Sequence, residues 1–172
     1  MAAGDRHVRE NTLIISPESL NEMVTLVAFF LFACVLGTLV EYVLHRFFLH
    51  SRFHHWVIRR HKLHHKTHVR YSIASEFLGF FPAAIPFLWI GFVHSTPAGI
   101  AFIAGEITFV LAVAIVHKWS HEAPHRIFWM NPAVHHVHHT DSVRWNYGVM
   151  TTFWDRVFGT YRLAPNRSSP VE

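Results

Sequence analysis

Residues 135–139 read His135-His136-Val137-His138-His139, the densest histidine cluster in a chain of 172 residues that holds 17 histidines. On a helix, His135, His138 and His139 lie three and four residues apart, so their imidazoles share one face. Such a face repels itself when its histidines are protonated, which disfavours it as a purely structural feature. Because neutral imidazoles are common metal ligands, the spacing predicts that this stretch forms one wall of a metal site.

Three more histidine groups lie next to apolar runs, namely His45 and His50, then His61, His64 and His65, then His117 and His121. The spacings within the last two groups predict that each occupies one face of a helix. His45 and His50 lie about 140° apart on an ideal helix, so they need a helix end or a wide cleft between them. Ten imidazoles are too many for one ion, and we therefore expect two ions of zinc, iron, copper or nickel to share them.

Apolar residues make up 51% of the chain, a high share for a soluble domain of this size. They concentrate in three runs, at residues 23–44, 73–93 and 98–116. The first run would extend roughly 33 Å as a helix, which is enough to cross a bilayer core. Pro82 and Pro86 predict a kink or a break in the second run. The fold class that we expect is an all-α integral membrane protein with three to four membrane segments.

The domain boundaries follow from the same pattern. Residues 1–22 are polar and form a lead-in, with a helix start predicted at Ser16-Pro17-Glu18. Residues 23–163 form the membrane domain, and residues 164–172 have the composition of a disordered tail.

The formal charge of +4 and the pI near 9.6 raise the question of nucleic-acid binding. The basic residues flank the apolar runs, however, so they indicate a membrane surface and no nucleic acid. With three crossings, residues 45–72 and 117–172 emerge on one side, and they carry 13 of the 15 Lys and Arg residues. The positive-inside rule therefore places this histidine-rich cap in the cytoplasm.

Two carboxylates are candidates for orienting the histidines, because a ligating imidazole usually donates its second N–H to an acceptor. Glu41 precedes His45 by one turn, and Asp141 follows His139 closely. Glu122 beside His121 and Glu106 inside the third apolar run are further candidates.

Further motifs accompany the histidines, namely Ala74-Ser75-Glu76, Asn146-Tyr147-Gly148 and Trp154-Asp155-Arg156-Val157-Phe158-Gly159-Thr160. With His45-Arg46-x3-His50 and His61-Lys62-Leu63-His64-His65, they make residues 40–161 resemble the fatty acid hydroxylase / sterol desaturase superfamily. The resemblance implies a helical membrane fold whose cytosolic cap holds two metal ions on the ten histidines His45, His50, His61, His64, His65, His117, His121, His135, His138 and His139.

The resemblance also implies an O2-dependent lipid hydroxylase or desaturase that uses two iron ions, with zinc as the alternative metal in the isolated protein. The expected substrate is a fatty acyl chain or a sterol taken from the bilayer, with Phe77, Phe80, Phe81 and Trp89 as candidate pocket walls. Nothing in these residues resembles a haem electron-transfer domain, so we expect the electrons to come from a separate protein.

Three alternatives stay open at this point. The carotenoid hydroxylases are comparably small, although the ending of this chain looks closer to the fatty acid and sterol branch. A membrane protein that binds or transports metal without catalysis would favour polar ligands within the spans, whereas these histidines lie beside them. A zinc hydrolase would need a general-base glutamate in a run such as His-Glu-x-x-His, which the sequence lacks.

Overall fold

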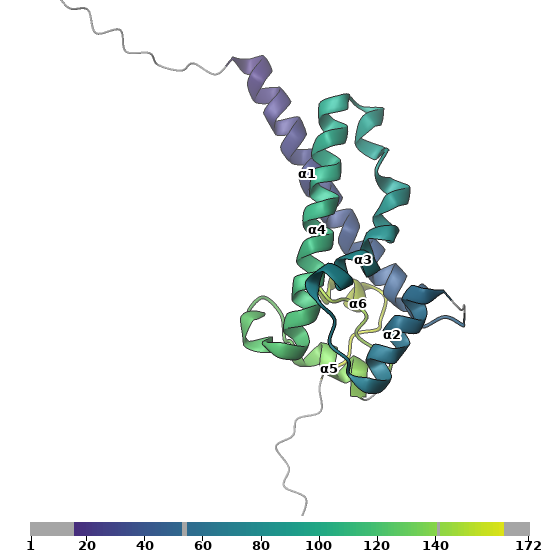
Figure 1. The fold of residues 1–172 in the computed structure, drawn as a ribbon. Helices are drawn as coiled ribbons and strands as arrows, with labels where there is room; N and C mark the ends of the chain where they lie inside the picture. The colour runs from purple at the N-terminus through teal and green to yellow at the C-terminus, as the bar shows by residue number, and fades with distance from the viewer. Residues whose placement is uncertain (1–15, 53–54, 141, 164–172) are drawn as a thin grey trace, which may run out of the picture.

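The computed structural model describes residues 16–52, 55–140 and 142–163, and helices are the only regular structure within them (Figure 1). The predicted all-α class is confirmed. Most of the predicted lead-in and the whole predicted tail lie outside the described residues. In chain order the elements are α1 (Pro17–Val43), η1 (Leu44–Leu49), α2 (Trp56–Thr67), α3 (Ile73–Ala84), η2 (Ile85–Phe87), η3 (Ile90–Val93), α4 (Thr96–Glu122), η4 (Pro124–Arg126), α5 (Ala133–Thr140) and α6 (Phe153–Val157).

Three segments are long and apolar enough to cross a membrane, as predicted: Pro17–Leu49, Ile73–Val93 and Thr96–Glu122. The first begins where the sequence indicates, because the Ser16 hydroxyl accepts a hydrogen bond from the Ser19 N–H and Pro17 occupies the first helical position. α4 begins in the same way, with the Ser95 hydroxyl accepting from the Ala98 N–H. Many large apolar side chains of α1 are exposed, as expected for a helix whose surroundings are lipid.

The second segment is broken, which confirms the effect predicted for its prolines. α3 contains Pro82 and ends at Ala84, and the 3-10 turns η2 and η3 follow it. Pro86 lies in η2, where its missing N–H and its ring prevent the regular helix from continuing.

α1 and α4 cross closely because small residues lie where they meet. A methyl group on Gly105 of α4 would come within 2.4 Å of the Phe30 carbonyl oxygen and 2.8 Å of the Ala33 Cβ. Small residues at such crossings let the backbones of membrane helices approach each other. The α1–α4 pair is therefore the frame to which the other elements attach.

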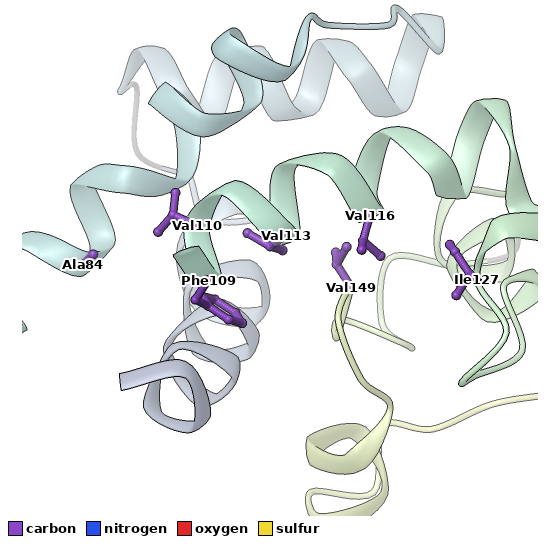
Figure 2. Close-up of a cluster of buried hydrophobic side chains, with 7 residues drawn as sticks. All are labelled: Ala84, Phe109, Val110, Val113, Val116, Ile127 and Val149. Carbon is purple, nitrogen blue, oxygen red and sulfur yellow. The ribbon is translucent and has the colours of Figure 1, made fainter. Parts of the chain in front are cut away.

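The buried apolar cluster connects this frame to the C-terminal part of the chain (Figure 2). Its members come from α3, from one face of α4 and from the segments after α4: Ala84, Phe109, Val110, Val113, Val116, Ile127 and Val149. The helices α2, α5 and α6 gather at one end of α1 and α4 (Figure 1). This end forms a cap that contains all ten candidate ligand histidines.

Candidate metal centre

The cap brings all ten predicted histidines together and separates them into two sets of five. The first set comprises His45, His50, His61, His65 and His138, and the second comprises His64, His117, His121, His135 and His139. Within each set, one ring nitrogen from every histidine lies within 4.8 Å of the others. Each set is a candidate site for one metal ion.

The two sets share their supporting helices. α2 gives His61 and His65, one turn apart, to the first set and His64 to the second. α5 gives one histidine, His138, to the first set and two, His135 and His139, to the second. The ring of His65 stacks on that of His139 with centroids 4.0 Å apart, so the sets lie against each other. Each three-histidine group lies on one helix, as the spacing predicts, and each helix contributes side chains to both sets.

The remaining candidate ligands come from the end of α4 and from η1, which directly follows α1. His117 and His121 lie one turn apart at the end of α4, as predicted. His45 lies in η1, a π-helical turn, and His50 is the residue that ends it. Since a π-turn bonds residues five apart, it brings His45 and His50 to one side, and their rings stack with centroids 5.3 Å apart. This π-turn supplies the geometry that an ideal α-helix could not.

The nitrogen positions fit a metal ion in each set. In the first set, the Nε2 atom of His50 lies 3.0 Å from that of His138 and 3.3 Å from that of His61. In the second, the Nε2 atom of His121 lies 3.0 Å from those of His64 and His135. Two nitrogens bound at right angles to one ion, each at about 2.1 Å, are separated by about 3.0 Å.

Hydrogen bonds on the outer nitrogens direct the lone pairs inward. Four of the histidines place Nδ1 next to an oxygen acceptor, so Nδ1 carries the hydrogen and Nε2 keeps the lone pair. The four bonds are His45 to the Tyr147 carbonyl (2.5 Å), His138 to the Trp145 carbonyl (2.7 Å), His64 to the Val69 carbonyl (2.8 Å) and His117 to the Glu76 carboxylate (3.1 Å). The Nε2 atom of His45 is buried and has no hydrogen-bond partner among the described residues, as expected of a metal ligand.

Burial also keeps these imidazoles in the neutral, metal-binding form. Burial, together with the Lys62 charge, lowers the pKa of His50 to about 4. Burial, together with neighbouring histidines, lowers the pKa of His138 to about 3 and of His65 to about 2. The pKa values of His61, His135 and His139 are lowered well below the ordinary value by burial and by adjacent histidines. At neutral pH these rings are uncharged and available as ligands.

The segment Trp145–Val149 holds two ligands through its carbonyl groups and is itself held through its N–H groups. Asp155 is fully buried and accepts hydrogen bonds from the N–H groups of Tyr147 and Gly148, both at 2.8 Å. A side chain on Gly148 would collide with the Thr151 carbonyl oxygen and the Asp155 carboxylate, which explains the glycine. The N–H of the next residue, Val149, donates to the Glu41 carboxylate at 3.1 Å.

Asn146 fastens the same segment to the rest of the cap. Its backbone has φ of 58°, a left-handed conformation that asparagine tolerates better than most residues. Its amide nitrogen donates to the carbonyls of Val134 and Arg162, and its amide oxygen accepts from the Arg162 N–H. The Asn-Tyr-Gly and Trp-Asp-Arg-Val-Phe-Gly-Thr motifs therefore form one hydrogen-bonded support beneath His45 and His138.

Three of the carboxylates that the sequence indicates as hydrogen-bond partners of the histidines have other partners in the structure or lie outside the described residues. Glu41 hydrogen-bonds to the backbone N–H of Val149, and no bond to a histidine ring is found for it among the described residues. Asp141 lies outside the described residues. Glu122 pairs with Lys118 at 2.6 Å. The carboxylate that does hydrogen-bond to a candidate ligand is that of Glu76, which bonds to His117. Glu76 belongs to the Ala74-Ser75-Glu76 motif, but the sequence gives no sign that it lies beside His117.

The class that this fold and these distances define is an all-helical protein with three candidate membrane spans and two candidate five-histidine metal sites. A profile of the fatty acid hydroxylase family matches residues 30–160. The chain belongs to this family.

Relatives with assigned names agree with the family. Rat fatty acid 2-hydroxylase (Rattus norvegicus) is 29% identical over 175 residues, covering 94% of this chain and 45% of the relative. The dihydroceramide fatty acyl 2-hydroxylase FAH2 of Arabidopsis thaliana is 30% identical over 138 residues, covering 75% and 58%. The chain spans about half the length of the curated relatives it matches. No solved structure gives a significant match.

Proposed function

We propose that the protein is an O2-dependent lipid hydroxylase whose reaction takes place at a pair of iron ions. The observation that carries this proposal is the division of ten buried or half-buried histidines into two adjacent sets of five, with the Nε2 lone pairs of four of them freed by hydrogen bonds at Nδ1. The first ion would bind to His45, His50, His61, His65 and His138, and the second to His64, His117, His121, His135 and His139. When bound, iron supplies the activation of O2 that breaks an unactivated C–H bond.

The proposed reaction inserts one oxygen atom of O2 into a C–H bond of the lipid. The second oxygen atom leaves as water, after taking up two electrons and two protons. We propose a separate electron-transfer protein as the source of the electrons. The protein's own task is to hold the ligands, exclude water and place the lipid chain.

Hydroxylation is favoured over desaturation because the matched relatives are named as fatty acid and dihydroceramide fatty acyl 2-hydroxylases. The substrate that we propose is accordingly a fatty acyl chain, either free or within a larger lipid. We also propose that the cap faces the cytoplasm, on the basis of its many Lys and Arg residues.

Mass spectrometry of lipids tests this proposal directly. Membranes that contain the chain, bound iron and a competent reductant are incubated under isotopically labelled O2. The expected product is a lipid that has gained one labelled oxygen atom. Unchanged lipids under these conditions would rule out an oxygenase, and an unlabelled hydroxyl group would indicate a reaction with water, as for a hydrolase or hydratase.

Glu76→Gln should weaken metal binding at the second set without preventing folding. The charged carboxylate orients the His117 ring at 3.1 Å and makes its Nε2 atom a stronger donor, and glutamine keeps the shape but loses the charge. We expect the affinity for iron to fall by about tenfold. Competition with a chelator, followed by metal analysis, measures this change.

Glu122→Gln is the matched control for this experiment. Glu122 adjoins His121 in sequence, but its carboxylate is bonded to Lys118 at the end of α4. The Glu122→Gln variant should bind iron with the same affinity as the wild-type protein. Equal losses in the two variants would mean that general charge near the cap, and not the His117 hydrogen bond, controls affinity.

A further inference from the structure

An apolar groove runs beside the histidine cap between two candidate membrane-spanning segments. It has a volume of about 670 Å³ and lies between the end of α1 with η1, the start of α2, and α3 with η2. Its walls are apolar except for His55. The prolines on its α3 side, Pro82 and Pro86, are exposed, so the groove opens sideways at the depth of the two segments. An occupant would therefore enter from the lipid and would have to be apolar.

The α3 wall of the groove consists of small residues and prolines. Gly79, Pro82, Ala83 and Pro86 recur at intervals of three and four, so they share one side of this segment. A methyl group added to Gly79 would meet no atom within 4 Å. The groove exists because this side of α3 carries no bulky side chain.

A smaller hollow lies beside the groove, next to both histidine sets. This second cavity, of about 30 Å³, is lined by His61 of the first set and by His64 and His117 of the second. Three residues line both cavities, namely Leu49, Val57 and Gly79, so the two cavities adjoin at these residues, which we call the neck. Phe80 also lines the hollow, whereas the predicted pocket walls Phe77, Phe81 and Trp89 do not line the groove.

We infer that the groove holds a single acyl chain of the lipid substrate, and that Gly79 and Ala83 determine which chains reach the histidines. This inference rests on the proposed hydroxylase function. Gly79 leaves the neck open, so that a chain carbon can approach the hollow beside His61 and His64. Ala83 lies one turn further along α3 and leaves room for the part of the chain that points away from the centre.

Two substitutions that narrow the groove test the inference. Gly79→Leu should fill the neck and lower the turnover of all acyl chains by about tenfold or more, while bound iron stays at the wild-type level. Ala83→Phe should shift the products toward shorter chains, again by about tenfold in the ratio of long to short. Products from a mixture of saturated acyl lipids, from myristoyl to lignoceroyl, give this ratio.

Leu78→Phe is the control, because Leu78 is the neighbour of Gly79 on α3 and its side chain is largely exposed. It should keep the wild-type rate and chain profile. Wild-type rates and profiles in both Gly79→Leu and Ala83→Phe would overturn the inference.

Photo-crosslinking separates this inference from the proposed function. A palmitic acid analogue with a diazirine on its chain is irradiated with the metal-free wild-type protein in membranes. Cross-links should map to the groove walls around Val57 and Ala83 and should decrease in Gly79→Leu. Cross-links there without any lipid oxidation by the iron-loaded protein would reject the hydroxylase and leave the groove as a lipid site. Oxidation with cross-links only elsewhere would reject the groove.

Discussion

His138→Ala is expected to abolish lipid oxidation and to lower the iron content of the purified protein. The His138 side chain is completely buried, its Nδ1 atom donates to the Trp145 carbonyl, and its Nε2 atom lies 3.0 Å from that of His50. Alanine would remove one of five ligands and leave a cavity among the others. Changing a residue that only hydrogen-bonds to a metal ligand already costs about 10–100-fold in metal affinity or activity. Because His138 is itself a candidate ligand, we expect its loss to lower activity by more than about a hundredfold.

His136→Ala on the same helix is the matched control. His136 is exposed and belongs to neither histidine set, although it lies in the same run of four histidines. Its variant should keep both iron and activity. Iron is measured by metal analysis and activity by the labelled lipid product. If His138→Ala kept wild-type iron and product, or if His136→Ala lost as much as His138→Ala, the assignment of the two sets would be wrong.

The sequence predicts the membrane fold well because the responsible signals are local. Apolar runs of spanning length, Ser16 and Ser95 before Pro17 and Pro97, and the prolines after α3 each act within a few residues. The close crossing of α1 and α4 depends on Gly105 meeting Phe30, which are far apart in the chain. No local pattern indicates which glycine faces which helix.

The sequence also predicts which histidines share a helical face. It does not predict how the histidines divide into two sets. His64 and His65 are adjacent on α2, yet they belong to different sets because α2 contributes side chains to both sets. Their assignment depends on how α2 and α5 pack. The π-turn at His45 was also not predictable as such, although the unfavourable spacing to His50 indicated that an ideal helix would not suffice.

The hydrogen-bond partners of the histidines are harder to predict from the sequence than the grouping of the histidines. Closeness in sequence to the histidines indicates Glu41 and Asp141, whereas Glu76 reaches His117 across a helix–helix contact. Asp155 acts on His45 only indirectly, because it accepts hydrogen bonds from the backbone N–H groups of the loop whose Tyr147 carbonyl bonds to His45. A motif such as Trp-Asp-Arg-Val-Phe-Gly-Thr can identify a family without revealing that its aspartate holds the loop that positions His45.

Asp155→Asn is accordingly expected to have a large effect on stability, although the residue touches no histidine. Its carboxylate accepts three hydrogen bonds, from the N–H groups of Tyr147 and Gly148 and from the Thr160 hydroxyl at 2.7 Å. Asparagine has the same shape but turns an N–H₂ group toward at least one of these donors. Hydrogen bonds to a charged group contribute about 1.5–3 kcal/mol each, so we expect a loss of about 3 kcal/mol in the free energy of unfolding.

Thermal unfolding in detergent, with a chelator present, measures this loss apart from any contribution of bound metal. Arg156→Gln is the control, since Arg156 is exposed and lies over the Tyr161 ring at 3.9 Å, a contact worth about 0.5–1 kcal/mol at an exposed site. The iron-loaded Asp155→Asn protein should also bind iron less tightly, because the Tyr147 carbonyl would no longer be fixed beneath the His45 ring. An unchanged unfolding temperature together with wild-type iron affinity would show that the loop keeps its position without Asp155. A loss of stability with unchanged iron affinity would instead separate the stability of the loop from the placement of His45.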